Sequence, residues 1–286
     1  MRILRVFPKQ TSYTPIDKLA YYPNGMIQAP MWTLFPEFEE IHISCSFTWD
    51  KDFCRKLQEE WQAFTDKFVK LGGPAFGSAA EDFTPGLYLK PNIIFTSRGC
   101  NNNCPWCIVP KIEGKLKELP IMPGNIIQDN NFLQTSKEHQ DKVFDMLQGQ
   151  RRICFKGGLQ ADLIDEHFIR NVSKIKNHIK ELWLACDTPR SIKAFTRACE
   201  KLRDAGFNRS KIKCYVLIDG NIEENEQRLQ AVYDAGAMPF AQLYREYDEK
   251  KTIYSKEIEK FARSWQRPPS INAHMEKGTD FRNFRV

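Results

Sequence analysis

The sequence lacks any long hydrophobic run. No stretch approaches the roughly 18 to 20 consecutive apolar residues that a bilayer-spanning helix needs. Its opening residues, MRILRVFPKQ, also lack the apolar core of a secretory signal. These absences argue against the membrane-spanning and secreted classes, so we expect a cytoplasmic protein with no membrane partner.

Charge of one sign is not in large excess either. The chain has 42 Lys and Arg against 36 Asp and Glu, which gives a formal net charge of +6. Many of the lysines are dispersed along stretches that have the pattern of solvated helix faces. This balance permits an anionic partner such as a nucleotide or nucleic acid, but does not require one.

Cysteine, by contrast, is present nine times in 286 residues. The nine are spaced too unevenly for the dense disulfide framework of a small secreted domain, and in a reducing compartment they are expected to be thiols or metal ligands. Cys154, Cys186 and Cys214 fall within predicted strands, where a free cysteine behaves as a small buried hydrophobe.

The fold class predicted from the pattern is α/β. From residue 91 onward, short apolar runs alternate with amphipathic helical stretches, which is typical of a parallel sheet covered by helices. A complete (β/α)8 barrel takes about 250 residues, whereas only about 155 separate Pro91 from Arg245. We therefore predict an open, partial (β/α)6 TIM-like barrel. Its six strands are expected near 92–97, 125–129, 151–157, 181–187, 211–219 and 238–244.

The flanking segments complete the predicted organisation. Residues 1–90 are expected to form a short N-terminal extension with one β-α-β unit, and 91–250 the partial barrel. Residues 251–286 are expected to form a C-terminal helix and an extended tail, because the segment from Arg267 onward lacks clear periodicity.

Three cysteines lie together in the stretch CNNNCPWC. Cys100, Cys104 and Cys107 form C-x3-C-x2-C on an asparagine-rich loop just after the first predicted barrel strand. Thiolates are the ligands that zinc and iron–sulfur clusters prefer. A structural zinc site needs a fourth ligand, and the next candidates, His139 and Cys154, lie beyond the following strand. A [4Fe–4S] cluster held by three thiolates would instead leave one iron open.

This spacing, the aromatic Trp106 before the last cysteine and the position after a first barrel strand resemble the radical S-adenosylmethionine superfamily. The resemblance implies a [4Fe–4S] cluster on the three cysteines and S-adenosylmethionine bound at the open iron. It also implies an external electron donor of the flavodoxin or ferredoxin type, and a 5′-deoxyadenosyl radical that abstracts hydrogen from a substrate. The overall layout resembles compact members of phage and prophage genomes.

The resemblance also implies further cofactor-binding positions. Gly157 and Gly158 match part of a Gly-Gly-Glu segment, although Leu159 replaces the acid, and Asp187 matches an acid that binds ribose hydroxyls. An ordinary tight turn remains the alternative for the two glycines, and a helix cap remains the alternative for Asp187. The adenine side is implied to involve Ile218, Gly220 and Glu223, for which a strand-to-helix turn is the alternative.

One more segment and the substrate class complete the hypotheses. Asp129 and Asn130 resemble an acidic segment of cobalamin-carrying relatives, but turn chemistry explains them equally well. The chain lacks the D-x-H-x-x-G cobalamin motif and the N-terminal cysteine triplet of methylthiotransferases, so neither activity is expected.

The positive charge and the stretch from Tyr244 to Tyr247 favour a nucleotide or modified base as substrate, while peptides remain open. The alternative function is a non-catalytic module that holds zinc or a structural iron–sulfur cluster and binds nucleic acid.

Overall fold

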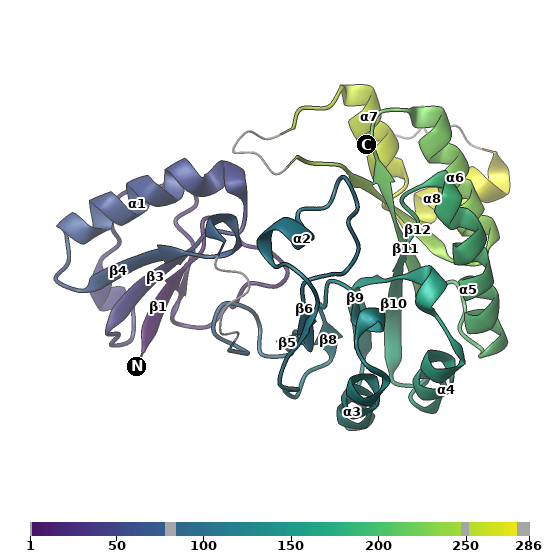
Figure 1. The fold of residues 1–286 in the computed structure, drawn as a ribbon. Helices are drawn as coiled ribbons and strands as arrows, with labels where there is room; N and C mark the ends of the chain where they lie inside the picture. Colours follow the sequence, from purple (N-terminus) through teal and green to yellow (C-terminus); the bar gives the residue numbers. More distant parts are fainter. Residues whose placement is uncertain (1, 78–83, 247–251, 279–286) are drawn as a thin grey trace. The chain divides into compact units, whose positions relative to one another are not determined.

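The chain folds into two compact units (Figure 1). The computed structural model describes residues 2–77, 84–246 and 252–278. The first unit is built mainly from the chain up to Ile93, and the second mainly from Ile94–Cys107, Gly114–Arg245 and the segment after Thr252. The predicted boundary between residues 250 and 251 lies outside the described residues.

The first unit contains a four-stranded parallel sheet with the strand order β2-β1-β3-β4. The expected β-α-β unit is present as β3, α1 and β4. The sheet is wider than predicted, because β1 and β2 add two strands to the expected β-α-β unit. The bounds are β1 (Ile3–Val6), β2 (Ala20–Tyr21), β3 (Glu40–Ser44), α1 (Lys51–Ala63) and β4 (Phe68–Gly72).

Helix α1 covers one face of this sheet with a narrow apolar stripe. Cys54, Leu57 and Trp61 are fully buried and pack with the alternate strand residues Ile41 and Ile43. Three short 3-10 turns accompany these elements: Trp32–Leu34, Thr48–Asp50 and Pro74–Phe76.

The second unit contains a six-stranded sheet whose strand order follows the chain, β5-β8-β9-β10-β11-β12. Strands β8 to β12 pair in parallel, so the chain is α/β with parallel sheets. All six predicted strands are confirmed, although the first two are short. Their bounds are β5 (Ile93–Ile94), β8 (Ile126–Ile127), β9 (Ile153–Leu159), β10 (Ile179–Ala185), β11 (Ile212–Ile218) and β12 (Met238–Leu243).

The segments that follow the strands form helices, because each of these segments has one apolar face and residues that favour a helix start or end. Ser136 and Asp165 accept hydrogen bonds at the N-termini of the first two helices, and Gly206 and Gly236 adopt positive φ after the next two. The helices are α3 (Lys137–Gln148), α4 (Glu166–Lys174), α5 (Ile192–Asp204), α6 (Ile222–Asp234), α7 (Lys256–Ser264) and α8 (Pro268–Lys277). Within the part of the chain that the structure describes, no helix combines the length and the apolar character that crossing a membrane would require.

Helix α8 corrects the prediction of an extended tail. The two prolines after Arg267 occupy the first turn of this helix, where a missing N–H costs nothing, and Ile271 is buried. The last residues of the predicted tail, 279–286, lie outside the described residues.

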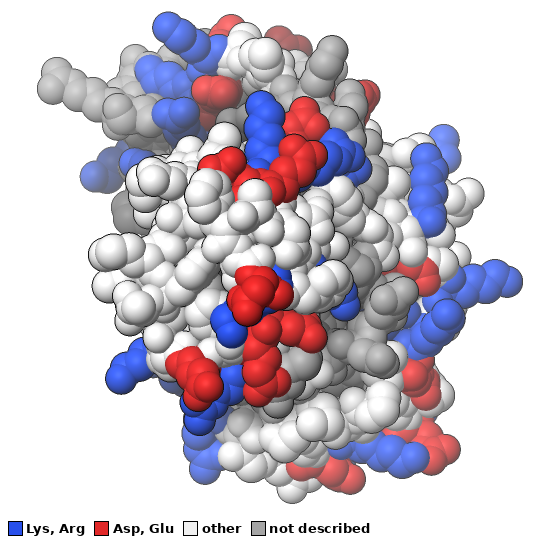
Figure 2. All heavy atoms as spheres, turned by 90° about the vertical axis from the view of Figure 1, so that its left-hand side faces the viewer, with Lys and Arg blue, Asp and Glu red and all other residues white. Residues whose placement is uncertain are grey.

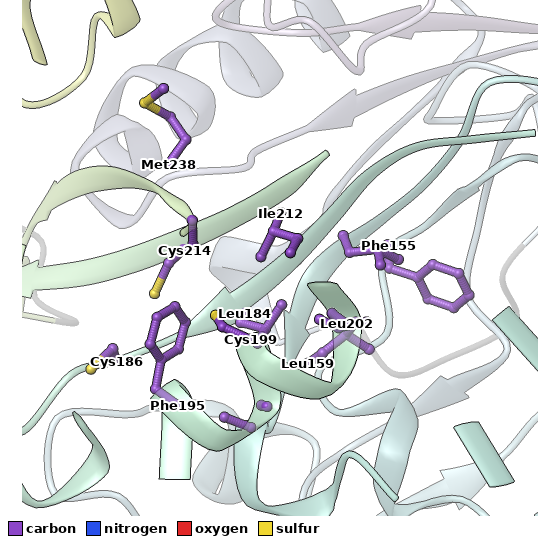
Figure 3. Close-up of a cluster of buried hydrophobic side chains, with 14 of the residues drawn as sticks. Phe155, Leu159, Leu184, Cys186, Phe195, Cys199, Leu202, Ile212, Cys214 and Met238 are labelled. Atoms are coloured by element: carbon purple, nitrogen blue, oxygen red, sulfur yellow. The ribbon is translucent and has the colours of Figure 1, made fainter. Parts of the chain in front are cut away.

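The core of the second unit lies between the helices and one face of the sheet. Phe155, Leu184 and Ile212 from the strands pack with Phe195 and Leu202 from α5 (Figure 3). Cys154, Cys186 and Cys214 are buried as predicted, and Cys199 joins them. Burial raises the pKa of the Cys199 thiol to about 12, so this group remains a neutral core residue at neutral pH.

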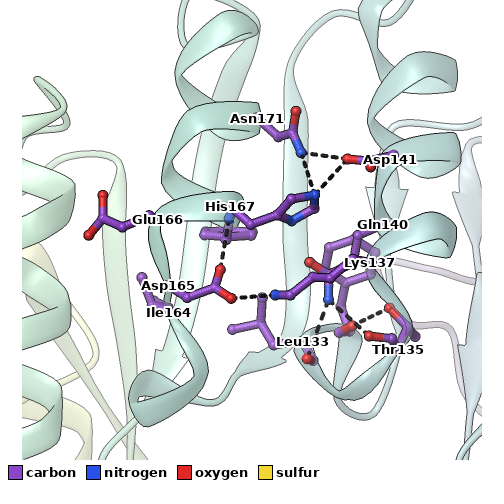
Figure 4. A network of polar contacts seen from close by, with 12 residues as sticks. Leu133, Thr135, Lys137, Gln140, Asp141, Ile164, Asp165, Glu166, His167 and Asn171 are labelled. Carbon is purple, nitrogen blue, oxygen red and sulfur yellow. Dashed lines mark hydrogen bonds and ion pairs between the residues drawn. The ribbon is translucent and has the colours of Figure 1, made fainter.

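Polar side chains join α3 and α4 (Figure 4). Lys137 Nζ lies 2.5 Å from Asp165 Oδ2, and His167 Nε2 lies 2.8 Å from Asp141 Oδ1. Asn171 donates to the same Asp141 oxygen at 2.7 Å. These contacts fix the spacing of the two helices that flank the ends of β8 and β9.

Candidate functional site

The three cysteines lie in the connection between two short antiparallel strands that the sequence analysis did not predict. These strands are β6 (Ser97–Arg98) and β7 (Lys117–Glu118), and the connection also contains α2 (Val109–Ile112). Cys100 N–H donates to Gly114 O at 3.1 Å, which closes the base of the loop. A side chain at Gly99 would place its Cβ 2.3 Å from Lys115 O, so the two arms approach as closely as glycine allows. We call residues 99–116 the cysteine loop.

A cluster of neutral amides fastens the cysteine loop to the ends of β8 and β9. Gln160 Oε1 accepts hydrogen bonds from Asn102 (2.9 Å), Asn131 (2.7 Å) and Gln134 (3.2 Å). Gln134 also donates to Asn102 Oδ1 at 3.0 Å and accepts from the backbone N–H of Asn101 at 2.8 Å. We call Asn102, Asn131, Gln134 and Gln160 the amide cluster. Sequence reasoning missed it.

The amide cluster also contacts one of the thiols. Asn131 is 4% exposed, and its Nδ2 lies 3.9 Å from Cys100 Sγ in hydrogen-bonding geometry. The short bond to Gln160 fixes the orientation of the amide, so that its second N–H is directed toward the sulfur. An N–H donor of this kind stabilises negative charge on a thiolate.

Asp129 anchors the segment that leads into the cysteine loop. Its buried carboxylate accepts the Thr96 N–H at 2.6 Å, the Thr96 hydroxyl, and the Ser97 hydroxyl at 2.8 Å. These contacts join the end of β8 to the segment that follows β5. The turn-chemistry alternative for Asp129 does not describe these long-range bonds, and a cofactor contact is not needed to explain the residue.

Burial gives Asp129 a specific pH signature. Burial raises the pKa of this carboxyl even though the Thr96 and Ser97 hydrogen bonds lower it. The folded protein therefore binds the Asp129 proton more tightly than the unfolded chain does. The stability that this protonation contributes is fully present below the unfolded pKa of about 3.9 and is lost as pH rises through the folded pKa.

Asp129→Asn removes this titration while keeping one oxygen acceptor. Urea unfolding at pH 4, 5, 6 and 7 should therefore show the stability of the natural protein falling with rising pH relative to the variant. Thr135→Ser, which keeps a buried hydroxyl that donates to Phe132 O and forms no hydrogen bond with Asp129, serves as the control. Parallel pH profiles for the natural protein and Asp129→Asn would contradict this assignment.

The three thiols are partly buried and influence one another. Burial, then the charges of Cys107 and Cys100, and then that of Asp187 raise the pKa of the Cys104 thiol. Three thiolates held on one short loop would repel each other, and a bound iron–sulfur core offsets that repulsion. The donor set therefore fits such a cluster.

A single metal ion is a poorer match. Within residues 2–77, 84–246 and 252–278, no group of three His, Cys, Asp or Glu side chains converges to hold one ion. In a four-iron cluster each thiolate binds its own iron atom, so the sulfurs need not converge on one point. The zinc alternative, by contrast, requires four donors around one ion.

Asp187 follows β10, at the same edge of the sheet as the cysteine loop. Its Oδ1 accepts the Leu217 N–H at 3.0 Å, and its second oxygen accepts no hydrogen bond from the described residues. The N-cap of the following turn is Thr188, so the helix-cap alternative for Asp187 is wrong. The buried Arg228 donates to Asp187 O and to Leu217 O, which fixes the ends of β10 and β11 together.

The other predicted cofactor residues differ in how exposed they are and in how much space surrounds them. Gly158 has φ of 97° and open space at its Cβ position, whereas a Cβ on Gly157 would lie 1.6 Å from Asp129 O. Gly157 is therefore explained by close backbone packing and Gly158 is not. Trp106 is partly exposed in the loop, and Gly220 and Glu223 are exposed around the start of α6. The Ile218 side chain is fully buried in the core cluster.

The segment behind the nucleotide hypothesis is only partly described. Tyr244 N–H donates to Ile218 O at 2.9 Å, which extends the β11–β12 pairing. Tyr247 lies outside the described residues. On the face drawn in Figure 2, basic and acidic side chains are interspersed. This mixed arrangement is typical of a solvated surface.

Comparison with known proteins gives a local match. No family model matches the chain. A segment of 68 residues, 24% of this chain, is 35% identical to ribosomal protein uS12 methylthiotransferase RimO of Delftia acidovorans. The same length is 38% identical to the RimO protein of a Polaromonas species and 37% identical to that of Polaromonas naphthalenivorans. The matched segment spans only 13 to 14% of the length of these relatives.

Methylthiotransferases are among the radical S-adenosylmethionine relatives considered from the sequence. The resemblance to compact phage and prophage members stays a prediction. Together with the cysteine spacing, the local matches support a relation to the radical S-adenosylmethionine superfamily at that general level.

Proposed function

We propose that this protein is a radical S-adenosylmethionine enzyme that abstracts hydrogen from a substrate through a 5′-deoxyadenosyl radical. Cys100, Cys104 and Cys107 hold a [4Fe–4S] cluster in this proposal. When bound there, the cluster supplies one electron to S-adenosylmethionine, which yields methionine and the 5′-deoxyadenosyl radical. An external donor of the flavodoxin or ferredoxin type supplies that electron.

One observation carries the proposal: the cysteine loop is fastened to the carboxyl ends of neighbouring parallel strands. Asp129, after β8, accepts a hydrogen bond from Ser97 just before the loop, and Gln160, after β9, accepts one from Asn102 in the loop. The charge of Asp187, after β10, acts on the Cys104 thiol. In parallel α/β folds this edge collects the functional groups. The strand order also supports an open partial barrel, because it never reverses as it does in a doubly wound sheet.

The residues of this chain have distinct roles in the proposal. The amide cluster holds the loop in place, and Asn131 stabilises the charge on the Cys100 thiolate. Gly158 leaves room for the close approach of S-adenosylmethionine. The second oxygen of Asp187 accepts a ribose hydroxyl. Trp106, Gly220 and Glu223 complete the surroundings of the cofactor, while Gly157 and Ile218 act by shaping the backbone.

The decisive experiment uses anaerobically purified and reconstituted protein. We expect about four iron and four sulfide per chain, and 5′-deoxyadenosine after addition of dithionite and S-adenosylmethionine, detected by liquid chromatography and mass spectrometry. One equivalent of zinc without affinity for S-adenosylmethionine would contradict the proposal and favour the binding-module alternative. Deuterium transfer from labelled candidates into 5′-deoxyadenosine would then identify the substrate.

Asp187→Asn tests the cofactor contact separately from the electron transfer. Asparagine keeps the oxygen that accepts the Leu217 N–H, but loses the charge that strengthens a hydroxyl contact. A hydrogen bond to a charged group contributes about 1.5–3 kcal/mol, so affinity for S-adenosylmethionine should fall by about tenfold or more. Equilibrium dialysis with the oxidised, cluster-loaded protein measures this.

Asp145→Asn, an exposed position on α3, is the matched control and should bind S-adenosylmethionine like the natural protein. Unchanged affinity in Asp187→Asn would remove Asp187 from the cofactor site.

A further inference from the structure

The sheet of the second unit has two chemically different faces. Alternate residues of a strand point to opposite faces, and along β10 to β12 one set belongs to the core that the helices cover. Figure 1 shows α3 to α6 along one side of these strands. The opposite face carries a group of charged and aromatic side chains, all half-buried except Trp183, which is 9% exposed. We call this group the ring–lysine face; it consists of Lys156 from β9 together with Glu181, Trp183, Lys213, Tyr215 and Phe240.

The rings on this face hold one another in fixed positions. Trp183 and Tyr215 stack with centroids 4.4 Å apart and an interplanar angle of 27°. Phe240 meets both rings edge-on, at 5.7 Å and 6.0 Å. Lys156 Nζ lies 4.6 Å from the centroid of Trp183. Such a group is a rigid surface for a planar partner, because little side-chain entropy remains to be lost on binding.

The charges on the ring–lysine face do not balance. Glu181 is satisfied by Lys156 Nζ at 2.6 Å and by the indole N–H of Trp183 at 2.8 Å. Lys213 is partly buried and forms no ion pair with the described residues. Burial lowers the pKa of the Lys213 ammonium; the charge of Glu181 opposes this in part, and the charge of Lys156 lowers the pKa further. Because burial outweighs the charge of Glu181 and no carboxylate of the described residues forms a direct ion pair with Lys213, an incoming anion relieves the remaining desolvation cost.

This face adjoins the site of the proposed reaction. Tyr215 pairs with Ala185 across β10 and β11, and the next residue on the same face of β11, Leu217, donates to Asp187. Two residues along a strand span about 6.6 Å. Asp187 in turn follows β10, at the carboxyl edge of the same sheet.

We propose that the ring–lysine face binds the substrate, and that this substrate is a planar aromatic ring carrying one anionic group. The anionic group pairs with Lys213, and the ring packs against Tyr215 and Phe240. This inference rests on the proposed function, because it assigns the molecule from which hydrogen is taken. A nucleotide and an aromatic carboxylic acid share this chemistry, and the experiment distinguishes them.

Isothermal titration with the full, reconstituted chain tests the inference with two matched ligand pairs. Uridine 5′-monophosphate is compared with uridine, and indole-3-acetate with indole. We expect the anion of one pair to bind at least about tenfold more tightly than its neutral partner. The pair that shows this preference identifies the class. The preference should weaken as pH rises through the pKa of Lys213, which lies below that of an ordinary lysine.

Variants separate the two contacts. Lys213→Gln should abolish the preference for the anion. Lys213→Arg should retain this preference, because the positive charge at position 213 is kept. Phe240→Leu should lower the affinity for the anion and for its neutral partner by the same factor. Lys193→Gln, at an exposed position on α5, is the charge-matched control. Circular dichroism and thermal unfolding establish that each variant is folded.

The outcomes distinguish this inference from the proposed function. If no anion binds at millimolar concentration, or if Lys213→Gln keeps the preference, the ring–lysine face is not the substrate site, even if 5′-deoxyadenosine still forms. If the protein holds no iron but binds an anion through Lys213, the proposed function fails while the binding face stands.

Discussion

Replacing Cys100, Cys104 and Cys107 together with alanine should reduce iron, sulfide and 5′-deoxyadenosine to background while leaving the fold intact. Each thiolate is the ligand of one iron atom in the proposed cluster, and no neighbouring side chain in the loop can replace it. The three cysteines are only partly buried, so their loss removes little apolar packing. Metal analysis, absorbance near the iron–sulfur charge-transfer bands and product detection measure the effect.

Cys154→Ala is the matched control for this experiment. Cys154 is buried in β9, away from the cysteine loop in sequence, and its thiol has no role in the proposal. This variant should lose some stability through a small cavity and keep its iron. Continued formation of 5′-deoxyadenosine by the triple variant would refute the assignment of the cluster ligands.

Gly157→Ala should destabilise the protein much more than Gly158→Ala does. A Cβ at Gly157 would lie 1.6 Å from Asp129 O and 2.6 Å from Asp129 C, and both atoms belong to the backbone. The ends of β8 and β9 would have to separate, which should cost about 4 kcal/mol or more. Because Asp129 anchors the segment that leads into the cysteine loop, iron retention should also fall.

Gly158→Ala should be far milder. Its Cβ would meet open space, so the cost is the strain of a positive φ, about 1–3 kcal/mol. The variant should fold and hold iron but bind S-adenosylmethionine more weakly, because the new methyl group occupies the space proposed for the cofactor. Urea unfolding and equilibrium dialysis on both variants test the comparison. Equal losses of stability would show that the close approach at Gly157 does not control the fold.

Sequence patterns predicted the second unit well because its elements are long enough to show periodicity. The runs around Phe155, Leu184 and Val216 are buried strands, and Gly206 and Gly236 follow helix ends, where glycine is a common end signal. The same reasoning missed β1, β2, β6 and β7. These strands have two to four residues, and a two-residue strand cannot be distinguished from a loop by alternation.

The prediction for the segment of α8 was wrong for a different reason. The segment was expected to be extended because it lacks clear periodicity, although proline at the first helical position favours a helix. The burial of Ile271 against the rest of the second unit then stabilises the helix. This tertiary contact is not visible in local periodicity.

The candidate site was predictable only where its residues are adjacent in sequence. The spacing of the cysteines identified the loop, but the amide cluster joins Asn102 to Gln160 across 58 positions. Those four amides are ordinary surface residues in sequence, and only the strand order brings them together. Likewise, Asp129 looked like a turn residue because its partners, Thr96 and Ser97, precede it by more than 30 positions.

The amide cluster has a consequence for how the loop behaves in different solutions. None of its four side chains ionises, so its hydrogen bonds carry no net electrostatic attraction for dissolved ions to weaken. The hydrogen bonds of the amide cluster should therefore form equally well in dilute buffer, in concentrated salt, and from mild acid to mild base. If binding or stability changes with ionic strength, we expect the change to come from ionised groups, such as the ammonium of Lys213, and not from weaker hydrogen bonds in the amide cluster.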